Sequence, residues 1–319
     1  MFQIKIKLFV ALGIVSLLFL LGNKNPENTT LPNSREELGR QLFFDPILSV
    51  DKSLSCSSCH KPEFAFADTL PFSKGVNGNF TKRNTPSAMN VAYREAYFWD
   101  GRVATLEEQA LFPIENPVEM NLKIEEALKR LNADENYKTA FKKIYNAEVD
   151  KKNLGDALAA YERTLETSGT PFDRFAKGDS TAISESAKRG QLVFNFKGKC
   201  FDCHFGPDFT GDEYRNIGLF NGKELNDAGR YSTTKNKEDK GKFKVPGLRN
   251  ASVTGPYMHN GMFKTLREVI DYYSEPEKFV KGSINVDPLT AKGVYLTEFE
   301  KQDLEAFLIS LTDSSFSKK

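Results

Sequence analysis

The sequence predicts a mostly α-helical protein built from two similar halves. Strand patterns are scarce along the 319 residues, whereas helical patterns preceded by capping residues recur. A pattern of helix, loop and Cys-x-x-Cys-His occurs twice, with the motifs CSSCH at 56–60 and CFDCH at 200–204. The chain is also long enough for two domains of ordinary size, each with its own core.

The N-terminus is predicted to direct export. Lys5 and Lys7 precede an apolar run from Leu8 to Leu21, which suits a signal peptide and is shorter than the roughly 20 residues that span a bilayer. A clear small-x-small cleavage site is missing, so an uncleaved anchor in the inner membrane is the alternative. We therefore expect residues 1–30 to be a signal peptide or anchor, and the protein to be periplasmic.

The helix before each motif is predicted from two matching stretches, LGRQLFFD and KRGQLVFN. Leu38, Leu42 and Phe43 have the spacing of one helix face, and Ser34 and Ser184 are the expected N-caps. The short repeat favours a duplicated domain.

The remaining elements follow in order. Residues 153–167, NLGDALAAYERTLET, form a plausible helix, and SGTPF after it predicts a domain boundary near residue 168. Residues 231–242, YSTTKNKEDKGK, are predicted to be a charged loop or insertion. The last segment is an amphipathic helix with an apolar stripe of Leu304, Phe307, Leu308 and Leu311.

The balance of charge gives no indication of a polyanionic partner. Lys plus Arg number 44 and Asp plus Glu 43, so no strong field of one sign points to nucleic acid or acidic lipid.

All four cysteines belong to the two motifs, which are Cys56, Cys59, His60 and Cys200, Cys203, His204. Two thiols three positions apart reach the two vinyl groups of one porphyrin, and the adjacent histidine offers a ring nitrogen to its iron. The motifs therefore predict two covalently bound c-type haems. Zinc bound by four cysteines would leave the histidines unused, with pairs far more widely spaced than usual. A thioredoxin-type dithiol would need a βαβ pattern.

The sixth position of each iron decides function, because an electron carrier fills it and a peroxide-using site leaves it open. Two proximal histidines leave only His259, so both haems cannot have two histidine ligands. The methionines are also few: Met1, Met89, Met120, Met258 and Met262. An open haem is therefore predicted.

Over residues 35–313 the chain resembles the bacterial di-haem cytochrome c peroxidase family, which includes the MauG-type enzymes. Besides the two haem motifs, the resemblance rests on RNTPSAMN (83–90), FWDGR (98–102), EQALFPIENPVEM (108–120), FKVPGLRN (243–250), TGPYMHNG (254–261) and TLREVIDYY (265–273). It implies two cytochrome c-like domains, 31–168 and 169–319, each with one c-type haem. It also suggests that the last helix packs on the first domain.

The resemblance implies a role for each half. The His60 haem would react with hydrogen peroxide and reduce it to water. The His204 haem would receive electrons from a small cytochrome or copper protein, and Trp99 would relay them between the haems. The oligomeric state stays open, a homodimer included.

By the same resemblance, Gln109, Pro113 and Glu119 form the pocket over the His60 haem, with Glu119 moving the protons. Spacing alone leaves Glu107, Glu108 and Glu115 as rivals. The resemblance also implies a calcium ion between the domains, held by Asn84, Thr254 and Pro256.

Two positions depart from the typical peroxidases. Val76 stands where many members have a histidine that blocks the peroxidatic iron. The typical peroxidases have an axial methionine where this chain has Tyr273, and MauG-type members have a tyrosine there. Met258 or Met262 would be the fallback ligand of the His204 haem. The plainer role for Tyr273 is packing on the face of its helix. A MauG-like enzyme that oxidises a protein or small molecule is therefore the second hypothesis. A pure electron-transfer cytochrome is the third.

Overall fold

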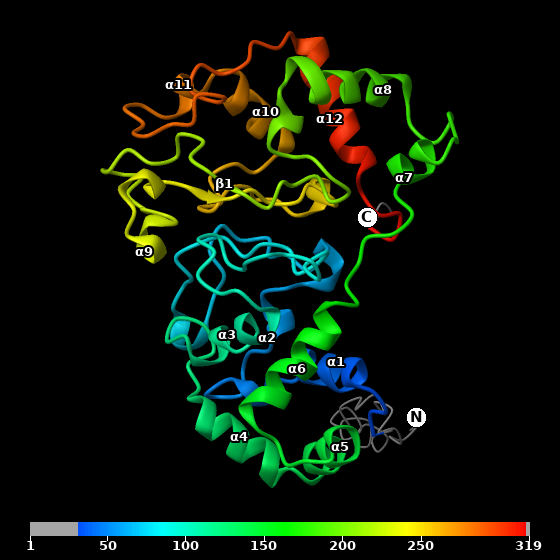
Figure 1. Cartoon of the computed structure of the whole chain (residues 1–319), viewed down its shortest axis with the longest axis vertical. Coiled ribbons are helices and arrows are strands. Elements are labelled where there is room, and N and C mark those ends of the chain that lie inside the picture. Colours follow the sequence, from blue (N-terminus) through cyan, green and yellow to red (C-terminus); the bar gives the residue numbers. More distant parts are fainter. Residues whose placement is uncertain (1–30, 317–319) are drawn as a thin grey trace, which may run out of the picture. The chain divides into compact units, whose positions relative to one another are not determined.

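The computed structural model describes residues 31–316, in which two groups of helices are joined by an irregular segment after α6 (Figure 1). Residues 1–30, predicted to direct export, lie outside the described residues. The first group comprises α1 (Arg35–Phe44), α2 (Leu106–Gln109), α3 (Phe112–Glu115), α4 (Ile124–Ala133), α5 (Glu135–Tyr145) and α6 (Lys151–Glu162). The second comprises α7 (Pro171–Ala176), α8 (Glu185–Leu192), α9 (Tyr231–Thr234), α10 (Leu266–Ser274), α11 (Pro276–Phe279) and α12 (Glu298–Ser310).

Strands are few, as predicted. Within residues 31–316 the only sheet pairs β1 (Tyr214–Arg215) with β2 (Phe243–Lys244) in antiparallel register. Single turns of 3₁₀ helix occupy Pro46–Leu48, Cys56–Ser58, Pro62–Phe64, Val76–Gly78, Cys200–Asp202, Lys237–Asp239 and Ala251–Val253, and a π-helical turn, Val193–Lys197, extends α8. No helix of this described part is long and apolar enough to cross a membrane.

The segment 231–242 is more ordered than the predicted loop. It contains α9 and the 3₁₀ turn at Lys237–Asp239. The side chain of Asn236 accepts a hydrogen bond from the backbone N–H of Glu238, and Thr234 donates to Asp239. Such local side-chain bonds stabilise short turns in a sequence whose charge pattern suggests a loop.

The first group is organised by α1 crossing α6. Ser34 caps α1 as predicted, accepting from the backbone N–H of Glu37 at 3.2 Å. At the crossing, a Cβ on Gly39 would lie 1.8 Å from the carbonyl oxygen of Ala157, so only glycine allows the helices to approach this closely. The buried face of α1 is the predicted one, Leu38, Leu42 and Phe43.

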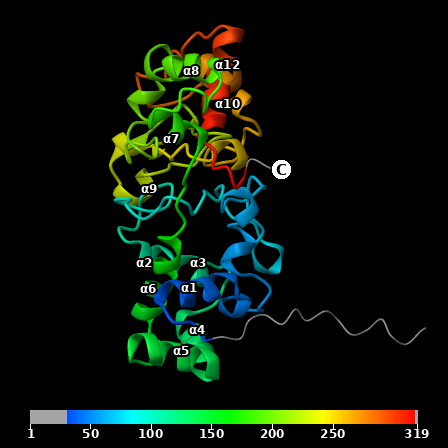
Figure 2. The same ribbon diagram turned by 90° about the vertical axis from the view of Figure 1, so that its right-hand side faces the viewer.

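The second group repeats this crossing with α8 and α12. Ser184 caps α8, and a Cβ on Gly190 would lie 1.8 Å from the carbonyl oxygen of Asp303. The predicted stripe on α12 is buried, and Phe307 contacts Phe194 and Phe209. Figure 2 shows α8, α10 and α12 gathered together.

The prediction that the last helix packs on the first domain finds no support among the principal contacts of α12. The main partners of α12 are α8 and α10 of its own half. The physical reason is that its apolar stripe completes the core that surrounds Phe194, as α6 completes the core of the first half.

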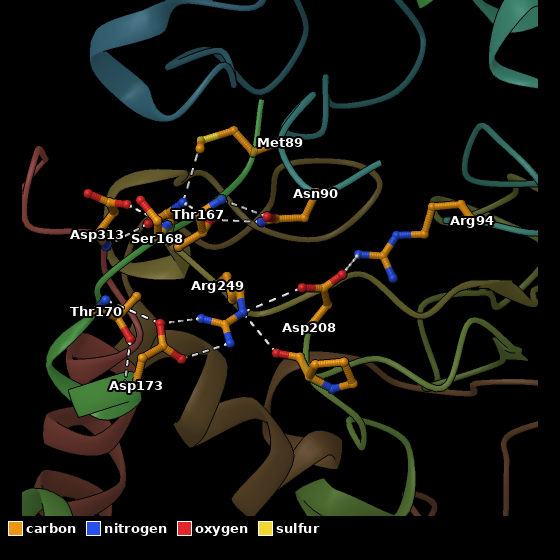
Figure 3. A network of polar contacts seen from close by, with 12 residues as sticks. Met89, Asn90, Arg94, Thr167, Ser168, Thr170, Asp173, Asp208, Arg249 and Asp313 are labelled. Carbon is orange, nitrogen blue, oxygen red and sulfur yellow. Dashed lines mark hydrogen bonds and ion pairs between the residues drawn. The ribbon is translucent and has the colours of Figure 1, made fainter. Parts of the chain in front are cut away.

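The segment that joins the halves is held by polar contacts (Figure 3). Asn90 and Asn250, one from each half, both donate to the Thr167 hydroxyl at 2.8 Å, and Ser168 donates its backbone N–H to Asp313. Arg249 makes a two-point ion pair with Asp173 close by. These bonds fix the chain where it passes between the halves.

Candidate functional site

The first Cys-x-x-Cys-His motif folds as a tight turn that presents His60. Cys56–Ser58 form a 3₁₀ turn, and the backbone N–H of His60 donates to the carbonyl of Cys56 at 2.9 Å. The Nδ1 atom of His60 lies 3.0 Å from the carbonyl of Phe66. Because a carbonyl only accepts, Nδ1 carries the proton and Nε2 keeps its lone pair. Burial lowers the pKa of His60, which favours the neutral ring that an iron ligand needs.

The second motif has the same geometry. The backbone N–H of His204 donates to the carbonyl of Cys200 at 2.8 Å, and Nδ1 donates to the carbonyl of Phe209 at 2.9 Å. Burial lowers the pKa of His204 as well. Both histidines are therefore oriented by a backbone carbonyl and offer Nε2.

The cysteines are free thiols, with no disulfide among them. Burial raises the pKa of Cys59 and Cys203 to about 11 and that of Cys200 to about 12, and raises that of Cys56 further. Residues 31–316 contain no group of three His, Cys, Asp or Glu side chains that could hold a metal ion, which a four-cysteine zinc site would require. Two half-buried thiols beside an oriented imidazole fit a covalently attached haem.

A cavity of about 990 Å³ brings the predicted residues of the first half together. Its lining includes Cys56, Cys59, His60, Asn84, Trp99, Gln109, Pro113 and Glu119. Of the four carboxylates considered from the sequence, only Glu119 is in this lining. Glu107 instead pairs with Arg163 at 2.8 Å, and Glu115 is exposed and accepts from the backbone N–H of Ile124.

Glu119 is fixed by its neighbours. Asn116 donates to its carboxylate at 2.7 Å, and the backbone N–H of Val76 donates to its carbonyl at 2.9 Å. A Cβ on Gly75 would lie 2.0 Å from the carbonyl oxygen of Val118, so this glycine permits the close approach of the two loops. Burial raises the pKa of Glu119, although Asn116 and the charge of Arg102 oppose the shift.

Sequence reasoning missed three residues around this cavity. Asn116 and Arg102 lie inside motifs quoted for the family resemblance, which could have drawn attention to them. Glu162 lines the cavity, is 8% exposed, and has its pKa raised to about 8 by burial. Nothing in the helical pattern of 153–167 distinguishes this carboxyl group from a solvated one.

Trp99 lies where the two halves touch. Its indole N–H donates to the carbonyl of Asn84 at 2.8 Å, and its own carbonyl accepts from the backbone N–H of Lys244 at 2.8 Å. The backbone N–H of Asn84 donates to the carbonyl of His259 at 2.7 Å, which joins Asn84 to the segment that contains Thr254 and Pro256.

His259, the third histidine, is buried and its ring stacks on Phe243 with 3.6 Å between centroids. Burial lowers its pKa to about 4.

The two neighbouring tyrosines of α10 differ. Tyr272 is 1% exposed, and its hydroxyl donates to the carbonyl of Ile217, so it is part of the core. Burial raises the pKa of Tyr273, with smaller contributions from Tyr272 and from Cys200 and Cys203 of the second haem motif. In the described residues its hydroxyl has no hydrogen-bond partner.

The fallback ligands differ in exposure. Met258 packs with the core cluster around Tyr272, whereas Met262 is 36% exposed and its sulfur lies 3.7 Å from the amide nitrogen of Asn260.

Comparison with known proteins agrees with this site. The sequence profile of the family described as di-haem cytochrome c peroxidase matches residues 33–181. The methylamine utilization protein MauG of Methylorubrum extorquens is 37% identical over 290 residues, covering 90% of this chain and 80% of that protein. The cytochrome-c peroxidase IdrP1 of Pseudomonas sp. strain SCT is 37% identical over 316 residues, covering 89% and 82%.

A solved structure of a MauG-like protein associated with microbial copper homeostasis superposes with a TM-score of 0.81 at 30% identity, covering 96% of this chain and 97% of that one. The diheme peroxidase BthA of Burkholderia thailandensis has a TM-score of 0.80 at 26% identity, covering 88% and 86%. The likeness extends through both haem motifs, and the fold is that of two cytochrome c-like domains. With this fold, these relatives and this cavity, the chain belongs to the di-haem cytochrome c peroxidase family, as a peroxidase that carries two c-type haems.

Proposed function

We propose that the protein is an exported enzyme that reduces hydrogen peroxide to water at the His60 haem, with electrons supplied through the His204 haem. The overall reaction consumes one peroxide, two electrons and two protons and forms two waters. The observation that carries the proposal is that one cavity wall contains His60, Glu119 and Gln109 together.

Each haem would be attached through the two thiols of its motif and coordinated by Nε2 of the adjacent histidine. When bound, the haem at His60 supplies an iron at which the O–O bond of peroxide can be broken. The carbonyls of Phe66 and Phe209 keep the two imidazoles in the tautomer that this coordination requires.

Glu119 is the residue that moves the protons. It takes a proton from one peroxide oxygen and returns it to the other, which lets the second oxygen leave as water. Asn116 holds the carboxylate in place, and Gln109 binds and orients the peroxide. Pro113 stiffens the segment between Gln109 and Glu119. Val76 has no side-chain donor for iron, so peroxide would meet no protein ligand to displace.

Electrons would pass by way of Trp99. Its bonds to Asn84 of the first half and Lys244 of the second support this relay. The name of the relative IdrP1, cytochrome-c peroxidase, supports a small cytochrome as donor, with a copper protein as the alternative.

Two measurements test this function, one on the wild-type protein and one on Glu119→Gln. The wild-type protein, as isolated and without prior reduction, should bind cyanide and cleave peroxide. The variant should keep its haem content but cleave peroxide more slowly by roughly 10²–10⁴, the usual contribution of a positioned acid–base group. The measurements are haem absorbance, cyanide titration and stopped-flow peroxide kinetics.

Glu125→Gln, on the exposed first turn of α4, is the matched control and should retain the wild-type rate. An unchanged rate in Glu119→Gln would transfer the role to another carboxyl group in the wall of the same cavity, with Glu162 the first candidate. A wild-type protein that stays inert until it is reduced would contradict the assignment of an open His60 haem.

A second candidate, oxidation of a protein or small molecule with peroxide as in MauG, is favoured by Tyr273. Unlike Tyr272, this residue has a hydroxyl without a partner in the described residues, and it lies close enough to Cys200 and Cys203 for them to affect its pKa. A phenolate ligand favours ferric iron more strongly than a thioether does. Such a haem would accept electrons reluctantly from an ordinary donor cytochrome.

Tyr273→Met separates the two candidates. If Tyr273 is the ligand, the substitution should raise the potential of the His204 haem and speed its reduction by a donor cytochrome, as followed by redox titration. Tyr272→Phe should do neither. An unshifted potential would point to Met258 or Met262 as the ligand and favour the plain peroxidase.

Further assignments also remain proposals. Calcium at Asn84, Thr254 and Pro256 is supported by the Asn84–His259 bond, which joins the two segments. We also propose domain limits of 31–168 and 169–319. The same holds for periplasmic export, with or without an anchor, and for a homodimer.

A further inference from the structure

A second cavity, of about 590 Å³, adjoins the main one. The two cavities share six wall residues, which are Phe98, Arg102, Pro113, Asn116, Pro117 and Glu119. The carboxyl group assigned to proton transfer therefore lies at the junction of the two spaces.

The second cavity extends to the surface of the protein. Its outer wall includes the exposed residues Glu108, Phe112, Glu115 and Lys151, with Phe112 48% exposed. Its inner wall includes Val103 and Leu111, which are buried. The space thus runs from solvent to Glu119 without crossing the contact between the halves.

Arg102 is held firmly in the shared wall. Its guanidinium lies 3.5 Å from the centroid of the Phe98 ring and donates to both carboxylate oxygens of Asp100, at 2.9 and 3.1 Å. The Phe98 ring in turn packs edge-on against Phe112 at 5.7 Å. Cation–π and ion-pair contacts together restrict the movement of a side chain that would otherwise be flexible.

We propose that this second cavity is the entrance through which peroxide reaches Glu119, and that Arg102, Phe98 and Phe112 restrict it to small hydroperoxides. Arg102 also lies close enough to Glu119 to favour its ionised carboxylate, while Asp100 balances the charge of the guanidinium. The proposal rests on the proposed function, because it assumes that peroxide reacts in the main cavity.

The test places a removable block in the entrance. Because the four native cysteines are assigned to haem attachment, Lys151→Cys would introduce the one free thiol of the holoprotein. Lys152→Cys is the matched control, since both lysines are exposed in the first turn of α6 and only Lys151 lines the cavity. Each variant is compared with and without a bulky disulfide-linked label, by its cyanide association rate and its rate of peroxide cleavage.

The label on Lys151→Cys should slow cyanide association roughly tenfold, and removal of the label should restore the rate, because small-ligand binding is limited by access. The label on Lys152→Cys should have no effect. Equal rates for the labelled and unlabelled Lys151→Cys protein would overturn the entrance. An unlabelled wild-type protein that neither binds cyanide nor cleaves peroxide would instead overturn the proposed function.

Phe112→Ala tests the size limit independently of labelling. It should raise the rate with cumene hydroperoxide relative to hydrogen peroxide, because the exposed ring is removed from the outer wall. An unchanged ratio of the two rates would show that these residues do not set the size of the substrate.

Discussion

At the scale of single residues, burial and hydrogen bonding separate the carboxylates that spacing in the sequence leaves as rivals. Glu107 is neutralised by Arg163, and Glu115 faces solvent. Glu119 is the one of these residues held by an amide donor inside the main cavity. A general base needs a pKa close to the working pH, and partial burial moves a glutamate in that direction.

The rate of peroxide cleavage should depend on pH through the carboxyl group of Glu119. Burial raises the pKa of Glu119, and only its ionised form can take a proton, so the rate should fall as the pH drops through that raised pKa. Asn116→Ala removes a donor that stabilises the charge. The acid limb of the pH–rate profile should therefore move to higher pH.

Asn136→Ala, on the exposed face of α5, is the matched control and should leave the profile unchanged. If Asn116→Ala lowers the rate equally at every pH, the amide positions Glu119 without tuning its charge.

At the scale of elements, each half is built around one close helix crossing. Gly39 on α1 meets the backbone of Ala157 on α6, and Gly190 on α8 meets that of Asp303 on α12. The helices α1 and α8 are the ones that precede the two haem motifs in the chain. A change in the crossing would therefore move the cysteines relative to the core.

Gly39→Ala and Gly190→Ala should each lower the free energy of unfolding by about 1–3 kcal/mol, the usual cost of overpacking a close contact. The added methyl group would overlap a backbone carbonyl, which cannot turn away as a side chain could. Denaturant unfolding of the haem-loaded protein measures this. Gln41→Ala, on the exposed side of α1, is the control and should have little effect on the free energy of unfolding. Equal stability of all three variants would mean that the two helices can move apart at no cost in folding free energy.

At the scale of the whole described chain, Arg83 links the halves. Its guanidinium donates to Asp227 of the second half at 2.7 and 2.8 Å and to Asp100, next to Trp99, at 2.7 Å. Burial alone would raise the pKa of Asp227, but the bonds from Arg83 outweigh it and hold the pKa below its usual range. The contact thus fixes the segment that carries the proposed relay.

Arg83→Ala should destabilise the protein by about 2–5 kcal/mol near neutral pH, because the partly buried Asp227 loses its two-point partner and Asp100 keeps only Arg102. The stabilisation of Asp227 is present above its unfolded pKa and is lost as pH falls through its lower folded pKa. The difference between wild type and variant should therefore shrink in acid.

Unfolding curves at several pH values measure this difference. Arg35→Ala, which breaks an exposed ion pair with Asp156, should cost no more than about 1 kcal/mol. A constant difference down to strongly acidic pH would contradict a role for the Asp227 charge.

Much of the fold could be predicted because it depends on local chemistry. The caps Ser34 and Ser184, the buried face of α1 and the apolar stripe of α12 follow from side-chain type and helical period. The partner of α12 could not be predicted from that stripe, because an apolar face specifies burial and not the surface that buries it. The short turns in 231–242 were missed because they depend on individual side-chain bonds.

The sequence by itself determined the two haem motifs, the mostly helical fold and the small supply of axial ligands, since these depend on residue type and spacing. Only the tertiary structure decided which carboxylate shares a cavity with His60, that Glu162 faces the same space, and that a second cavity meets the first at Glu119. The physical reason is that burial, cavity shape and electrostatic field arise from segments far apart in the chain, and their values are set only when those segments pack together.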